Sequence, residues 1–137
     1  MMARMNLPDN DTTAITLYGI VNCDTVKKAR AWLTAEGLEY RFHDFKKYGV
    51  PAAALQGWID ALGWDALVNR RGTTWRQLDA AAKAAVCDAT SAACLLTQHT
   101  SAIKRPVVEW RKAGVLLQTS VGFDAGHWAQ RLTSLQD

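Results

Sequence analysis

The stretch AITLYGIVNCDTVKKAR, residues 14–30, decides the fold, because an apolar strand ends within it and a basic helix begins. Its first part, 14–20, is rich in β-branched and aromatic residues, which favour a short buried strand. Apolar residues then recur at the spacing of one helical face, at Val26, Ala29 and Leu33. We therefore predict a strand over 14–20 and a helix over 24–36, with Cys23 at their junction and Gly37 as the C-terminal cap.

The next segments predict a second strand and then a helical lobe. EYRFHDF, residues 39–45, alternates aromatic and polar side chains with the period of two that is typical of a strand with one covered face. Pro51 suits the first position of a helix that ends at Gly63. Short helical patterns separated by loops continue from there, so the region of about 51–103 is interpreted as a helical insertion.

The C-terminal part predicts a hairpin and a final helix. PVVEW (106–110) and VLLQTSV (115–121) are two strands joined by a turn in which Gly114 suits a left-handed backbone. Asp124 is placed to cap a last helix, whose apolar face consists of Trp128, Leu132 and Leu135. The order β-α-β, helical insertion, β-β-α predicts an α/β thioredoxin-like plan, in which a mixed sheet of four strands is flanked by helices.

Length and composition favour one domain. The chain has 137 residues, of which 49% are hydrophobic and 21% charged, enough for one core of ordinary size. We expect residues 1–13 to be a disordered lead-in and residues 14–137 to form the domain. No run approaches the roughly 18 apolar residues that cross a bilayer, and the first residues do not resemble a secretory signal. We expect a cytoplasmic monomer that does not bind membranes.

The distribution of charge is more informative than its sum. A net charge of +3 is too small to indicate a nucleic-acid-binding protein. The basic residues gather in three places, namely Lys27, Lys28 and Arg30, then Arg70, Arg71 and Arg76, then Lys104 and Arg105. These groups form an anion site if folding brings them together, and ordinary solvated surface if it does not.

Cys23 is the candidate nucleophile. At a helix start it meets the free N–H groups of the first turn and the positive end of the helix dipole, and both favour the thiolate. An ordinary thiol is only about 3% ionised at neutral pH, whereas a helix start and nearby cations such as Lys27 increase that fraction. The alternative is that Cys23 is a small buried apolar residue. We favour a nucleophilic or redox-active thiol.

The other cysteines and the histidines show no pattern of a reactive or metal-binding site. Cys87 and Cys94 lie in Ala- and Leu-rich helical stretches and are interpreted as packing residues. The chain has 3 cysteines and no CxxC pair, so we expect no disulfide framework. We expect the resolving thiol to come from another molecule, unless folding brings Cys87 or Cys94 close to Cys23. The spacing of the histidines matches no metal site, and we expect no bound metal at His43, His99 and His127.

Three separated motifs carry a family resemblance: NCDTVKKAR (22–30), NRRGTTWRQL (69–78) and IKRPVVE (103–109). In this order and at this separation they resemble the ArsC/Spx/YffB family, and its YffB branch in particular, over about residues 15–135. The resemblance implies a thioredoxin-like fold, and it makes Cys23 the counterpart of the nucleophile of ArsC-type arsenate reductases.

The resemblance also implies which residues bind the substrate. Arg105 corresponds to an anion-binding arginine, and Pro106 to a proline that is cis in this fold and faces the active loop. Arg71, with Arg70 as the less favoured alternative, corresponds to a second arginine. The predicted substrate- and anion-binding residues are Asn22, Asp24, Thr25, Lys27, Arg71, Arg105 and Pro106.

Two departures from arsenate reductases bear on the activity. Those enzymes have a serine three residues after the cysteine, where this chain has Val26, and an arginine on the strand that holds Val115 to Leu117 here. Because a tetrahedral dianion needs several charge-assisted donors, both losses weaken arsenate binding. We therefore favour a glutathione-dependent thiol oxidoreductase in which Cys23 forms a mixed disulfide. Arsenate reduction with glutathione and glutaredoxin is an alternative.

The favoured function implies glutathione as co-substrate and no bound cofactor. Its partners are then glutathione, glutaredoxin and a small-molecule or protein disulfide. A different class of protein, the Spx-like regulators that bind RNA polymerase, uses a CxxC as a redox switch, and Val26 replaces its second cysteine here. A third alternative is a scaffold that has kept the fold and lost the activity.

Overall fold

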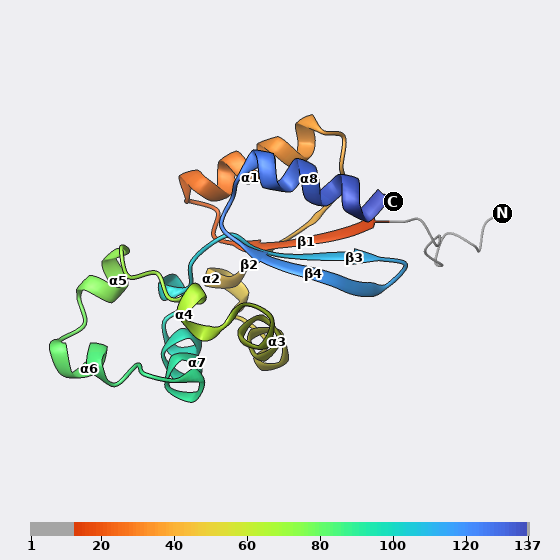
Figure 1. Ribbon diagram of the computed structural model, residues 1–137. Helices are drawn as coiled ribbons and strands as arrows, with labels where there is room; N and C mark the ends of the chain where they lie inside the picture. Colours follow the sequence, from red (N-terminus) through yellow and green to blue (C-terminus); the bar gives the residue numbers. More distant parts are fainter. Residues whose placement is uncertain (1–12, 137) are drawn as a thin grey trace.

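The computed structural model describes residues 13–136, and its centre is a four-stranded mixed sheet with the strand order β2-β1-β3-β4 (Figure 1). The strands are β1 (Thr13–Gly19), β2 (Arg41–Asp44), β3 (Val107–Lys112) and β4 (Val115–Val121). β1 pairs in parallel with β2 and antiparallel with β3, and β3 pairs antiparallel with β4. This topology confirms the thioredoxin-like plan that the order of elements predicted.

Helices cover both faces of this sheet. They are α1 (Asp24–Ala35), α2 (Phe45–Tyr48), α3 (Ala52–Leu62), α4 (Trp64–Leu67), α5 (Thr73–Arg76), α6 (Ala80–Ala84), α7 (Ala89–Gln98), the 3₁₀ helix η2 (Thr100–Ala102) and α8 (Ala125–Gln136). Figure 1 shows α1 and α8 on one face, and α2, α3, α4 and α7 on the other. The helices between β2 and β3 form the predicted inserted lobe, with α5 and α6 farthest from the sheet. Among the described residues, no helix is both long and apolar enough to cross a membrane.

Each face of the sheet carries its own hydrophobic core. The core under α1 and α8 consists of Ile15, Leu17, Val26, Ala29, Leu33, Val108, Trp110, Trp128 and Leu132. The core on the lobe side consists of Ile20, Phe45, Leu55, Trp58, Ile59, Leu67, Val68, Leu96, Ala102, Ile103 and Val107. Val107 and Val108 belong to different cores because consecutive side chains of a strand point to opposite faces. The sheet is therefore the common wall of the two cores.

The junction of β1 and α1 depends on a glycine. A Cβ atom on Gly19 would lie 2.8 Å from Cγ2 of Val26, which is fully buried. Only a residue without a side chain lets the helix approach the strand this closely. At the other end of α1, Gly37 takes a positive φ of 73° and its N–H donates to Thr34, which confirms the predicted cap.

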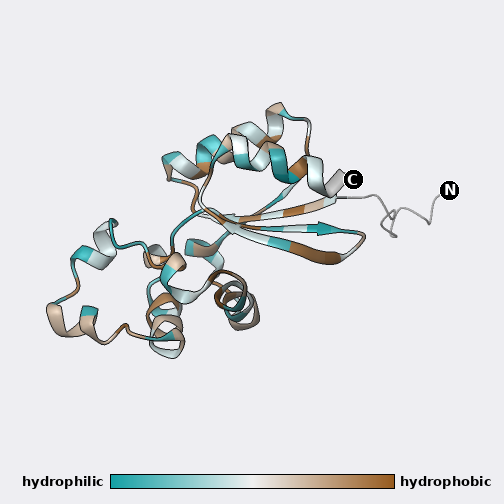
Figure 2. Ribbon diagram, in the orientation of Figure 1, coloured by the Kyte–Doolittle hydropathy of each residue, from teal (hydrophilic) through white to brown (hydrophobic). Residues whose placement is uncertain are grey.

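The hairpin turn between β3 and β4 has positive φ at both central residues, Ala113 (54°) and Gly114 (82°). This backbone fits the twist of an antiparallel pair, and Gly114 was predicted for it. β4 is an edge strand, and its hydrophobic end beside the turn is brown in Figure 2. The apolar residues exposed there are Val115, Leu116 and Leu117.

A buried carboxylate connects the sheet to the lobe. Glu109 is 6% exposed and accepts hydrogen bonds from the hydroxyl of Tyr18 (3.1 Å), Nε1 of Trp58 (3.0 Å) and Nη1 of Arg111 (2.8 Å). Three donors satisfy a charge that would otherwise be costly to bury. Burial, together with the negative charge of Glu109, raises the pKa of Tyr18 to about 12.

Several element boundaries differ from the predictions. β2 is shorter than 39–45, because Asp44 caps α2 by accepting hydrogen bonds from the backbone N–H groups of Lys46 and Lys47. Pro51 is the N-cap of α3 and not its first helical residue. The predicted disordered lead-in covered residues 1–13. Residues 1–12 lie outside the described residues, and the prediction is wrong for Thr13, which is the first residue of β1.

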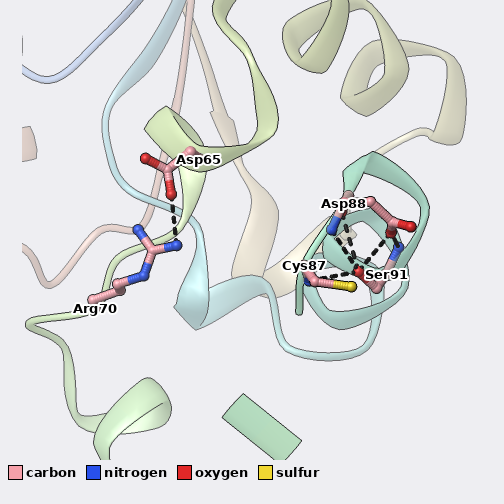
Figure 3. A network of polar contacts seen from close by, with 5 residues as sticks. All are labelled: Asp65, Arg70, Cys87, Asp88 and Ser91. Atoms are coloured by element: carbon pink, nitrogen blue, oxygen red, sulfur yellow. Dashed lines mark hydrogen bonds and ion pairs between the residues drawn. The ribbon is translucent and has the colours of Figure 1, made fainter. Parts of the chain in front are cut away.

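The interpretation of Cys87 and Cys94 as packing residues is wrong, because both are exposed. α7 buries Ala92 and Leu96, and a residue two positions from Ala92 points about 200° away around the helix. Cys87 precedes the helix, where the side chain of Ser91 caps the backbone N–H groups of Cys87 and Asp88 (Figure 3). Both cysteines are therefore exposed to solvent.

Candidate active site

Cys23 opens into a cavity of about 590 Å³ at one end of the sheet. The cavity lies among the start of α1, the loop before β3, the end of β4 and the start of α8. Its lining consists of Cys23, Thr25, Asn69, Lys104, Arg105, Ser120, Val121, Gly122, Phe123, Asp124, His127, Trp128 and Arg131. Segments that are far apart in the sequence thus surround a single thiol.

Cys23 is the N-cap residue of α1, in an extended backbone conformation with φ −140° and ψ 122°. Its carbonyl oxygen accepts the N–H of Lys27 at 2.9 Å, as the first bond of the helix. Its side chain makes no capping hydrogen bond, and the residue is only partly buried. The sulfur is therefore neither sealed inside the core nor used to complete the helix, and the cavity gives a reactant access to it.

The loop before β3 brings Arg105 and Pro106 to this region. The Arg105–Pro106 peptide bond is cis, as the resemblance implied, and Pro106 is buried with its carbonyl accepting the N–H of Gly122 at 2.8 Å. Nη1 of Arg105 donates to the carbonyls of Ser101 (2.9 Å) and Ile103 (3.1 Å), which fixes the guanidinium. Its Nε is buried and has no hydrogen-bond partner among residues 13–136. Arg105 thus lines the cavity, and its own loop does not use all of its donors.

A backbone clip connects the lobe to the same loop. Val68 and Ile103 form an antiparallel bridge, in which the N–H of Asn69 donates to Ala102 (2.8 Å) and the N–H of Lys104 donates to Leu67 (2.7 Å). This clip holds the start of the RRG segment, residues 70–72, against the loop that contains Arg105. As a result, Asn69 and Lys104 line the cavity that contains Cys23.

The start of α8 contributes an acid, an imidazole and a further cation to the cavity. Asp124 caps the helix by accepting the N–H of His127 at 2.9 Å, and this hydrogen bond lowers the pKa of the Asp124 carboxyl. Nε of Arg131 donates to the side-chain oxygen of Gln118, and its guanidinium lies 5.5 Å from the centre of the Trp110 ring. Partial burial lowers the pKa of Arg131.

The structure brings some of the predicted site residues together and leaves others apart. Cys23, Thr25 and Arg105 line the same cavity, and the cis Pro106 lies next to it in the chain. The remaining predicted residues do not belong to its lining, namely Asn22, Asp24, Lys27 and Arg71. The first three are exposed on the helix start, and Arg71 lines a separate hollow.

Several residues of the lining were not among the predicted site residues: Asn69, Lys104, Ser120, Asp124, His127 and Arg131. Of these, Lys104 was named only as part of a basic group. Lys104 had a usable signal, since it directly precedes the Arg105–Pro106 pair. Asp124 was predicted only to cap a helix, and His127 was considered only as a metal ligand. Within residues 13–136, no group of three or more His, Cys, Asp or Glu side chains is arranged to hold a metal ion.

The arrangement suits thiol chemistry on a charged reactant. An accessible sulfur lies in a hollow that also holds Lys104, Arg105 and Arg131 as cations and Asp124 as an anion. Guanidinium groups bind carboxylates through charge-assisted hydrogen bonds. A small thiol or disulfide with carboxylate groups therefore matches the cavity in charge.

Comparison with known proteins gives consistent matches. Residues 18–130 match the model of the ArsC family. A protein of Haemophilus influenzae, described as uncharacterized, is 45% identical over 94 residues, which are 69% of this chain and 82% of that protein. The structure of a YffB protein is 42% identical with a TM-score of 0.76, covering 85% of this chain and 96% of that one. The solution structure of an arsenate reductase (ArsC) related protein from Brucella melitensis is 40% identical with a TM-score of 0.66, covering 87% and 94%.

Proposed function

This chain belongs to the ArsC family, and from this premise we propose that it is a glutathione-dependent thiol oxidoreductase with Cys23 as its nucleophile. Family membership and the likeness to an arsenate reductase-related protein support a function of the thiol oxidoreductase type. The observation that carries the proposal is the position of Cys23. It is a partly buried N-cap residue that opens into a cavity lined by Lys104, Arg105 and Arg131.

The proposed reaction is thiol–disulfide exchange in two steps. The Cys23 thiolate attacks the glutathione sulfur of a mixed disulfide RS–SG, forms Cys23–S–SG and releases RS⁻, which takes a proton from water. A glutathione thiolate then attacks the same sulfur atom of glutathione in the intermediate, releasing oxidised glutathione and the Cys23 thiolate. One glutathione is oxidised for each disulfide reduced. A glutaredoxin thiol can replace glutathione in the second step.

The charges of glutathione fit those of the cavity. Glutathione has two carboxylates and one ammonium group, and the lining offers Lys104, Arg105 and Arg131 for the carboxylates and Asp124 for the ammonium group. Lys27, which was expected to hold a carboxylate, lies outside the lining. We therefore assign that role to Lys104 and Arg131 in addition to Arg105.

The environment of Val26 argues against the alternative functions. This residue, three positions after Cys23, is fully buried and faces Gly19 in the core. This position of the helix therefore offers the cavity neither the serine hydroxyl that arsenate reductases have three residues after the cysteine nor a second thiol for a CxxC switch. The arrangement supports exchange between one protein thiol and an external thiol.

The proposal is tested by incubating the protein with oxidised glutathione and weighing the intact chain. Because Cys87 and Cys94 are exposed and form adducts of their own, the reference protein is the Cys87→Ser/Cys94→Ser variant. We expect this variant to gain one glutathione, and the additional Cys23→Ser change to abolish the adduct. A reference variant that stays unmodified under these conditions would contradict the proposal.

A further inference from the structure

A second hollow of about 430 Å³ lies beside the cavity that contains Cys23, lined by Asp65, Ala66, Val68, Asn69, Arg70, Arg71 and Lys104. We propose that this RRG hollow binds an oxyanion, a phosphate or a carboxylate, that a disulfide substrate carries at a distance from its sulfur. This inference rests on the proposed thiol exchange at Cys23 and adds a substrate class to it. The substrate is then a disulfide of an extended thiol that ends in an anionic group.

The two hollows are neighbours because they share lining residues. Asn69 and Lys104 line both of them. A ligand with its sulfur at Cys23 can therefore pass along these two residues into the RRG hollow. The backbone clip between Asn69 and Ala102, and between Lys104 and Leu67, keeps the shared boundary in place.

The side chain of Arg70 is positioned by contacts with other side chains. Its Nη2 donates to Oδ1 of Asp65 at 2.6 Å, as Figure 3 shows. Its guanidinium also lies 5.5 Å from the centre of the Trp75 ring and 6.0 Å from that of Trp64. A side chain with these contacts loses less conformational freedom when it binds an anion. Trp75, which from its place beside the RRG residues could line the cleft, belongs to the lining of neither hollow, and its contact with Arg70 gives the ring a positioning role.

The side chains that line the RRG hollow carry a net positive charge. Arg70, Arg71 and Lys104 contribute positive charge, and Asp65 is the one acidic residue among those that line it. Like charges that share a hollow repel one another, and an added anion removes this repulsion. Guanidinium groups also present paired donors that match the oxygens of a phosphate or carboxylate. Arg71 thereby gains a role in anion binding that does not require it to touch the reacting sulfur.

Cations in both adjoining hollows indicate an extended substrate with more than one anionic group. The cavity at Cys23 already offers cations for the carboxylates of glutathione, so the RRG hollow provides for charge beyond them. A short thiol without a remote anion has no group that can bind in the RRG hollow. The inference therefore predicts discrimination between disulfides of similar reactivity that differ in a remote charge.

The test measures the rate of mixed-disulfide formation at Cys23 in the Cys87→Ser/Cys94→Ser background, with two matched pairs of probes. Coenzyme A disulfide and pantethine share the thiol arm and differ in the phosphates and in the adenosine that they carry. Oxidised glutathione and its ethyl ester differ in the carboxylates. The probe variant is Arg70→Gln/Arg71→Gln, and Lys46→Gln/Lys47→Gln on α2 removes the same charge at exposed positions that line neither hollow.

We expect Arg70→Gln/Arg71→Gln to slow the reaction of at least one anionic probe about tenfold, the size that one charge-assisted hydrogen bond provides. The matched probe that lacks this anion should react as before, and Lys46→Gln/Lys47→Gln should change neither. A loss with coenzyme A disulfide alone identifies the anion as a phosphate, and a loss with oxidised glutathione alone identifies a carboxylate. Equal rates for the two double variants in both pairs would overturn the inference and leave the proposed function standing.

A second readout does not depend on Cys23. In a Cys23→Ser variant, inorganic pyrophosphate should shift the side-chain Nε–H signals of Arg70 and Arg71 in NMR spectra, and the Lys46→Gln/Lys47→Gln change should leave this titration unaltered. Failure of every disulfide to react with Cys23 would refute the proposed function. Absence of shifts with pyrophosphate, together with unchanged probe rates, would refute the anion site.

Discussion

Tyr18 lies in β1 and Cys23 lies just after it, and their side chains are in different environments. The thiol of Cys23 opens into a cavity with cations, whereas the hydroxyl of Tyr18 donates to the buried carboxylate of Glu109 on the lobe side. At one residue the surroundings leave the functional group accessible, and at the other they fix its protonation state. The difference follows from which face of the sheet, or which end of the helix, each residue occupies.

Tyr18 makes stability depend on pH in alkaline solution. Its pKa in the folded protein is raised to about 12, above the ordinary value of 10.0, by burial and by Glu109. The folded state holds the phenolic proton more tightly, so this contribution to stability is fully present below pH 10 and is lost as the pH rises from about 10 to about 12. Urea unfolding from pH 8 to pH 11.5 should show a steeper loss for the natural chain than for Tyr18→Phe. Parallel curves would contradict the assignment.

At the scale of elements, the contact of β1 with α1 depends on the absence of a side chain at Gly19. Val26 occupies the space that a Cβ atom would need, at 2.8 Å. The helix start, and with it the N-cap position of Cys23, is therefore set by close packing as well as by hydrogen bonds. A side chain at Gly19 strains the packing of the helix start against β1.

Gly19→Ala should lower the free energy of unfolding by about 1–3 kcal/mol, as overpacking of a tight core does. Gly57→Ala on α3 is the matched control, since nothing lies within 4 Å of the Cβ position there. That change should be neutral or raise stability by up to about 1 kcal/mol, because alanine is the better helix former. Urea unfolding measures both values, and an equal effect of the two changes would show that the close contact is not decisive.

Local patterns in the sequence were sufficient for the elements with strong periodicity or clear turn residues. The helix after Cys23, the α3 helix and the hairpin with Gly114 appear where the sequence predicts them. The exposure of Cys94 could not be predicted, because a short Ala-rich helix shows no contrast between its two faces, and Cys87 lies before the start of that helix. The end of the second strand was missed because Asp44 starts a new helix there.

At the scale of the whole molecule, the site lies where the two cores meet. Cys23 packs against both the lobe core and the core under α1 and α8. Short sequence motifs mark Cys23 and Arg105, and both residues line the cavity. Arg131 and Asn69 could not be predicted to line it, since their approach to the thiol depends on how α8 and the clipped loop close around it. Long-range packing leaves no local signal for such residues.

Because one sheet is the wall of both cores, we expect them to unfold together. The indole of Trp58 reports on the lobe core, where it donates to Glu109, and that of Trp110 reports on the other core, where it donates to Ser120. In a urea titration followed by NMR, the two indole N–H signals should disappear with the same midpoint. Separate midpoints would show that the lobe is an independent folding unit.

The central claim is that Cys23 carries out glutathione-dependent reduction, and turnover tests it most directly. The rate of oxidised glutathione formation is measured with glutathione and a glutathionylated substrate, coupled to glutathione reductase and NADPH. The account predicts full activity for Cys87→Ser/Cys94→Ser and only the uncatalysed rate once Cys23→Ser is added. Undiminished turnover in the protein that lacks Cys23 would contradict the account.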